Sequence, residues 1–222
     1  MSTPTPLILA SASPRRRELL AYLGVAFTVL PAEIDESVPE SMDDPVAFAR
    51  HLAETKASAI ARRHRRAAVL AADTIVVADG RILDKPADAE AARNTLRTLR
   101  NRPHEVTTAV ALAYESNVWV DHATTCIFMR DYTDEEIASY IASGDPFDKA
   151  GSYAIQDRRF HPVDRCEGCY CNVVGLPIVL TQRLMEEASL TVLDLNPPDL
   201  PPECYPCPLS EPANISNPLI TW

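Results

Sequence analysis

The first third of the chain alternates short apolar runs with polar links, and this pattern predicts strands and helices in turn. The apolar run Leu7–Ala10 predicts a short buried strand. The segment 14–23 predicts a helix, because a proline stands in its first turn and Gly24 follows it as a stop. The run "FTVLPAEIDES" predicts a second strand that leads into an acidic loop at Asp35 and Glu36.

Longer elements follow. Asp44, a favourable N-cap before Pro45, predicts a helix that ends near Ala61. The apolar run 67–78 predicts a long strand, and Asp79-Gly80 predicts a hairpin turn with a short return at 81–83.

The second half continues in the same way. The segment 87–100 predicts a helix, and "HEVTTAVALAY", "NVWVDHAT" and "CIFMRDY" predict three successive strands. Thr133 and Glu136 form a capping-box pattern that begins a helix ending near Ser143, and a last helix is expected over 178–188. Interleaved helices and strands, together with hairpins, predict an α/β fold with a mixed sheet and flanking helices.

The composition changes near residue 196. Eight of the 19 prolines lie between Pro197 and Pro218, so little regular structure is expected there. We therefore predict one domain over residues 1–195 and a proline-rich, cysteine-containing tail over 196–222.

Composition and charge narrow the class of protein. At 222 residues and 46% hydrophobic content, the chain can build a sizeable core. Its formal net charge of −10 argues against an extended nucleic-acid-binding surface, although a small anionic ligand remains compatible with a local basic cluster. No segment reads as a secretory signal or a membrane helix, so a cytoplasmic protein without a membrane partner is expected.

Three consecutive arginines, Arg15 to Arg17, stand at the predicted N-terminus of the first helix. Cations there oppose the helix dipole, so an ordinary solvated helix start explains them poorly. A strand that ends in Ser-x-Ser before a helix offers hydroxyls and free backbone N–H groups, and arginine adds forked donors. Ser11, Arg15 and Arg16 are therefore candidate phosphate ligands.

Two further charges interrupt apolar patterns. Asp73 lies inside the predicted strand 67–78, where it needs a cation, a metal or hydrogen-bond donors unless it faces water at a strand edge. Lys56 lies on the apolar stripe of the predicted helix 44–61, and it would usually be expected to snorkel to the surface.

Together with Lys85 and Glu36, the candidate residues above form two sets. The Ser, Arg and Lys side chains can bind phosphate. The Asp and Glu side chains can bind Mg²⁺, which proteins usually hold with carboxylates and substrate phosphates. The chain has no G-x-x-x-x-G-K-[ST] segment, so it is not a P-loop protein.

Several ordered segments together resemble one known family. "LILASASPRRRELL", "IDES", "AADTIVVADGRILDKP", "DKAGSYAIQ" and "NVVGLP" resemble the successive motifs of the Maf family of nucleoside triphosphate pyrophosphatases, over roughly residues 7–188. The resemblance implies an elongated fold of the inosine triphosphatase type, with two lobes around a cleft. It also implies a divalent cation, Mg²⁺ or Mn²⁺, a homodimer, and hydrolysis of a nucleoside triphosphate to the monophosphate and pyrophosphate.

The resemblance assigns roles to individual residues. Asp73 corresponds to the family's proton acceptor, with Glu36 or Asp73 as a ligand of the cation, and whether Asp73 acts as base or ligand stays open. The other site residues that the resemblance implies are Ser11, Arg15, Arg16, Lys56, Lys85 and Gln156.

Arg15, Thr74 and Gln156 resemble the branch that acts on dTTP and UTP rather than the branch that acts on 7-methyl-GTP. Two alternatives remain: turnover of 7-methyl-GTP, and a nucleotide-binding cell-division regulator without turnover.

The cysteines lie outside this resemblance. Cys166, Cys169 and Cys171 stand in "RCEGCYC", and Cys204 and Cys207 stand in "ECYPC". C-x-x-C pairs are common halves of tetrahedral zinc sites, so we predict a structural zinc ion shared between the two groups, remote from catalysis. Free buried thiols, a disulfide and an iron–sulfur cluster are the alternatives.

Overall fold

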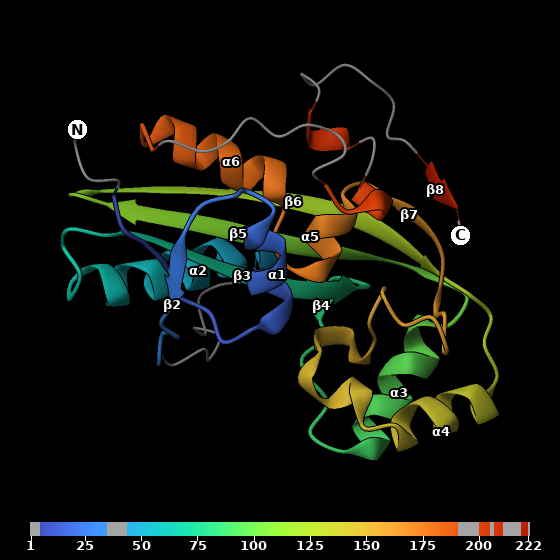
Figure 1. Cartoon of the computed structure of the whole chain (residues 1–222). Coiled ribbons are helices and arrows are strands. Elements are labelled where there is room, and N and C mark those ends of the chain that lie inside the picture. Colours follow the sequence, from blue (N-terminus) through green and yellow to red (C-terminus); the bar gives the residue numbers. More distant parts are fainter. Residues whose placement is uncertain (1–4, 35–43, 191–199, 205–206, 211–218, 222) are drawn as a thin grey trace.

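A computed structural model describes residues 5–34, 44–190, 200–204, 207–210 and 219–221 of the chain. Its eight strands form one mixed sheet in the order β2-β1-β3-β5-β6-β7-β8, with β4 beside β3 (Figure 1). The pairs β1–β2 and β1–β3 are parallel, and the remaining pairs are antiparallel. The predicted mixed α/β fold is therefore confirmed.

The predicted elements keep their order, and further short elements lie between them and in the tail. The strands are β1 Leu7–Leu9, β2 Phe27–Val29, β3 Ala68–Ala78, β4 Arg81–Ile82, β5 Pro103–Tyr114, β6 Asn117–Met129, β7 Val163–Glu167 and β8 Leu219–Thr221. The α-helices are α1 Pro14–Ala21, α2 Pro45–Ala61, α3 Ala89–Leu99, α4 Asp134–Ala142, α5 Tyr170–Val174 and α6 Ile178–Glu187. Short 3₁₀ turns are η1 Asp145–Asp148, η2 Ala150–Ser152, η4 Pro202–Cys204 and η5 Pro208–Ser210.

The helix starts follow from local chemistry. The side chains of Ser13, Asp44 and Asp88 each accept a hydrogen bond from a backbone N–H of the first turn of α1, α2 and α3. At α4, Thr133 and Glu136 form the complete capping box that their spacing predicts.

Alternating side chains of the central strands pack into two cores, one on each face of the sheet. Leu7 and Leu9 pack with α1, α5 and α6, whereas Ile8 packs with α2. A third core joins α3 and α4 to the far ends of β3, β5 and β6, and it forms the lower lobe in Figure 1. The sheet is thus shared by two lobes, as the resemblance implies.

Two predictions about strands are wrong. "NVWVDHAT" and "CIFMRDY" form the single strand β6, because the ladder with β5 runs unbroken from Asn117 to Phe128 across the polar middle. The tail is also not entirely irregular, since β8 pairs antiparallel with β7 at the edge of the sheet. In both cases long-range pairing decides the structure where the local apolar pattern is weak.

The predicted boundary at 195 and the acidic loop with Asp35 and Glu36 lie outside the described residues. Among the helices that the structure describes, none is long and apolar enough to cross a membrane.

Candidate active site

A cavity of about 660 Å³ opens beside the C-terminal end of β1 and the middle of β3. Its walls come from the β1–α1 link, from α2, from the segment after β4 and from the segment 148–156. It is lined by every predicted nucleotide-site residue that the structure describes: Ser11, Arg15, Arg16, Lys56, Asp73, Thr74, Lys85 and Gln156. Glu36 lies outside the described residues.

Asp73 and Lys56 form a buried ion pair in this cavity. Lys56 Nζ donates to Asp73 Oδ1 at 2.6 Å, and each residue is only 7% exposed. Asp73 is therefore not a water-facing strand-edge residue, and Lys56 does not snorkel to the surface. The pairing of β3 with β5 fixes the position of Asp73 in the sheet, and α2 brings Lys56 over it because its apolar stripe packs on β3 and β5. Such a pair places a carboxylate, with one oxygen already oriented, at the wall of the cavity.

Arg16 lines the same cavity and is held in place by three hydrogen bonds. Its Nε donates to the backbone oxygen of Gly175 at 2.9 Å, its Nη2 donates to Thr74 Oγ1 at 2.9 Å, and its Nη1 donates to Ser11 Oγ at 3.4 Å. A guanidinium fixed in this way keeps its charge in one place and loses little freedom when an anion binds.

The other two arginines differ from Arg16. Arg15 Nη1 lies 3.3 Å from Asp148 Oδ2, and both residues line the cavity. Arg17 is exposed, as expected for a solvated residue.

Asp148 and Lys149 also line the cavity, although the sequence did not predict them as site residues. Lys149 Nζ donates to Asp148 Oδ1 at 2.6 Å, so Asp148 bridges Lys149 and Arg15. These neighbouring cations lower the pKa of the Asp148 carboxyl, against the opposing effect of its partial burial. Both residues stand in the "DKAG" segment, which is part of a motif that resembles the family, so this motif could have identified them. Only the fold brings them close to Arg15.

A chain of hydrogen bonds to buried residues fixes Thr74, the hydrogen-bond partner of Arg16. Thr74 Oγ1 lies 2.9 Å from Thr108 Oγ1, whose hydroxyl donates to the backbone oxygen of Asn172 at 2.7 Å. The Asn172 side chain, fully buried, accepts from the Thr108 N–H and donates to Val106 O and Thr125 Oγ1. Because Thr108 donates onward, Thr74 donates to Thr108 and accepts from Arg16. No sequence signal identified Asn172 or Thr108.

Tyr153 forms part of the wall toward the second lobe. Its hydroxyl lies 2.7 Å from His104 Nε2, and burial lowers the pKa of His104 to about 4 while it raises the pKa of Tyr153. The imidazole is therefore neutral near pH 7, so the His104–Tyr153 pair adds no charge to the wall of the cavity.

Lys85 and Gln156 are exposed residues that line the open side of the cavity. Gln156 and Arg15 also line a neighbouring hollow of about 530 Å³, to which Pro201, Pro202 and Glu203 of the tail contribute.

The donor set suits a hard divalent cation. Asp73, Asp84 and Asp148 supply carboxylate oxygens to the cavity, and Mg²⁺ favours one or two carboxylates combined with substrate phosphates. Arg15 and Lys149 contact both carboxylate oxygens of Asp148, whereas Lys56 contacts Oδ1 of Asp73, so Asp73 and Asp84 are the better candidates.

The predicted zinc residues do not all converge. Within the described part of the chain, the thiols of Cys169, Cys204 and Cys207 lie within 4.8 Å of one another. Cys166 does not belong to this group, because β7 turns its side chain into the core with Tyr153 and Phe160.

Comparisons with known proteins agree with this arrangement. The family described as "Maf-like protein" matches residues 6–188. A dTTP/UTP pyrophosphatase from Thermomicrobium roseum is 54% identical over 95% of this chain and 96% of its own length. Two further proteins of that name are similar: one from Koribacter versatilis is 46% identical over 83% of this chain and 95% of its own, and one from Moorella thermoacetica is 48% identical over 81% and 93%.

The family match spans both lobes and every described residue of the cavity. It includes the ordered motifs that carry Ser11, Asp73, Lys85 and Gln156. By this match and by its similarity to these relatives, the chain belongs to the Maf family.

Proposed function

We propose that this protein hydrolyses dTTP and UTP to the nucleoside monophosphate and pyrophosphate. The observation that carries the proposal is the buried Lys56–Asp73 pair in a cavity whose other charged groups are mostly basic. The names of the curated relatives support the same reaction and the same nucleotides. A cavity of about 660 Å³ also lies within the size range of small-molecule sites.

The basic side chains contact different parts of the triphosphate. Arg16 is held by Ser11, Thr74 and Gly175, so it presents a fixed fork to phosphate oxygens. Arg15 and Lys85 add charge that stabilises the pyrophosphate as it leaves.

Asp73 acts on the attacking water. Lys56 fixes Oδ1, and the carboxylate orients the water and accepts its proton as the water oxygen bonds to the α-phosphorus and the bond to pyrophosphate breaks. A bound Mg²⁺ or Mn²⁺, held by Asp73 with phosphate oxygens and with Glu36 or Asp84, would neutralise charge on the α-phosphoryl group.

Arg15, Thr74 and Gln156 are proposed to favour pyrimidine nucleotides. Thr74 is fixed between Arg16 and Thr108, and Gln156 is exposed on the open side of the cavity, where a base can reach it.

The test is pyrophosphate release from a panel of nucleotides with Mg²⁺ present. We expect UTP and dTTP to give the monophosphate and pyrophosphate, with kcat/KM at least about tenfold above that for 7-methyl-GTP, which corresponds to about 1.4 kcal/mol of transition-state discrimination. Faster turnover of 7-methyl-GTP would reassign the substrate. Protection against thermal unfolding by nucleotide without any product would show a binding protein instead.

Two finer expectations stay predictions. Sedimentation of the purified protein tests the homodimer, and localisation of a tagged chain tests the cytoplasmic location.

A further inference from the structure

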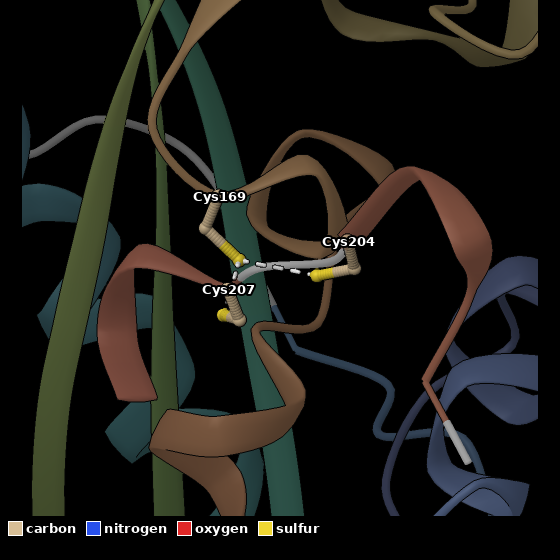
Figure 2. Close-up of side chains that lie close together, drawn as sticks. All are labelled: Cys169, Cys204 and Cys207. Carbon is tan, nitrogen blue, oxygen red and sulfur yellow. Dashed lines mark hydrogen bonds between the residues drawn. The ribbon is translucent and has the colours of Figure 1, made fainter. Parts of the chain in front are cut away.

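Three buried cysteines from distant parts of the chain meet beside α5. Cys169 precedes α5, and Cys204 and Cys207 come from the tail beyond the part that matches the family. Figure 2 shows the three side chains reaching toward one another from separate segments. Their exposed fractions are 4% or less, so this group is closed to solvent.

The sulfur spacing fits a metal rather than a disulfide. The Cys169 Sγ atom lies 3.9 Å from Cys204 Sγ and 3.9 Å from Cys207 Sγ. Four thiolates at about 2.3 Å around zinc form a tetrahedron whose edges are about 3.8 Å. A disulfide needs about 2.05 Å, and Cys169 could form one with only one of its two neighbours.

A fourth thiol, that of Cys171, lies near Cys169 and Cys204 but outside the group of three whose sulfurs lie within 4.8 Å of one another. Cys171 is fully buried, and its side chain interacts with those of Cys169 and Cys204. Cys169-x-Cys171 and Cys204-x-x-Cys207 bring two thiols each. The total of four thiols equals the number of ligands in a closed structural zinc site.

Apart from the cysteines, the described part of the tail is held by the pairing of β8 with β7 and by a few apolar contacts. Leu200 and Pro201 are the buried apolar residues that accompany Cys204 and Cys207 in the described part of the tail. In this part of the tail, η4 contacts α5 and η5 contacts α6, and Leu209 is only partly buried. A metal bound by cysteines of the tail and of the domain would add its binding free energy to the attachment of this small proline-rich segment.

We propose that Cys169, Cys171, Cys204 and Cys207 bind one structural zinc ion that fastens the C-terminal tail to α5. Cys166 and Cys126 take no part. The site is distinct from the cation site of the catalytic cavity, and it fixes the tail residues Pro201 to Glu203 along the neighbouring hollow.

Elemental analysis of the full chain, purified without added metal, measures the site directly. We expect about one zinc per chain, retained through dialysis against a weak chelator. Variant Cys204→Ser is expected to lose the zinc and to lower Tm by several degrees, whereas Cys166→Ala, from the same "RCEGCYC" run, keeps the zinc.

If Cys204→Ser fails to fold, cobalt substitution of the wild-type protein decides instead. Tetrahedral thiolate coordination gives intense visible and near-ultraviolet bands, and alkylation of the thiols abolishes them. Zinc and iron both far below stoichiometry, together with no cobalt bands, would overturn the proposal. So would stoichiometric iron, which would indicate a cluster, or zinc that disappears in Cys166→Ala but persists in Cys204→Ser.

Discussion

At the scale of single residues, the site uses charges that break local rules. Arginines at a helix N-terminus and an aspartate inside a buried strand are unfavourable by themselves. Each becomes favourable through contacts that only the fold provides, such as Lys56 Nζ with Asp73 at 2.6 Å. Local violations of this kind mark functional positions.

Arg16 and Arg17 form a matched pair for testing this view. Arg16→Lys removes the fork that contacts Ser11, Thr74 and Gly175, so we expect kcat/KM for UTP to fall about tenfold to a hundredfold, or roughly 1.4 to 2.7 kcal/mol. Arg17→Lys changes an exposed side chain and should leave kcat/KM unchanged. Steady-state kinetics of both variants give the answer, and equal losses in the two would refute the special role of Arg16.

At the scale of elements, the end of α5 connects the core to the site. Gly175 has a φ of 120° and follows the helix that carries Asn172, and its carbonyl holds Arg16. A Cβ at this position would lie 3.3 Å from Thr74 Oγ1 and 3.4 Å from Arg16 Nε. The backbone of this turn therefore sets the position of two residues of the cavity.

Gly175→Ala should cost about 1 kcal/mol of stability through backbone strain, and it should also lower turnover severalfold because it displaces Arg16. Gly80→Ala is the control: its φ is also positive, at 73°, but nothing lies within 4 Å of the added Cβ. Urea unfolding together with UTP hydrolysis separates the effects. Similar stability losses with turnover reduced only in Gly175→Ala are expected, whereas unchanged turnover in both variants would contradict the role of this turn.

At the scale of the whole molecule, the sequence predicted what depends on neighbours along the chain. Asp44 and Thr133 cap the helices that they predict, and the apolar run 68–78 is one strand. The mixed sheet follows from that order of elements.

The sequence did not predict what depends on contacts between distant segments. β7 was not expected, because its sequence "VDRCE" is largely polar and its pairing comes from β6 and β8. Asn172 likewise gains its role only where β5, β6 and α5 meet. Side chains that act through tertiary hydrogen bonds leave no periodic signal.

The central claim is that Asp73 carries the hydrolysis, and Asp73→Asn tests it most directly. The change breaks the buried ion pair with Lys56, at a cost of about 3–5 kcal/mol, so Asp73→Asn/Lys56→Met is measured beside it to separate folding from chemistry. Nucleotide-dependent thermal stabilisation identifies protein that still folds and binds.

The measurement is kcat for pyrophosphate release from UTP by folded Asp73→Asn protein. We expect kcat to fall by about 10²- to 10⁴-fold in both variants, because the group that accepts the proton of water is gone. Turnover within about threefold of the unsubstituted protein, at about 0.65 kcal/mol in the barrier, would contradict the account.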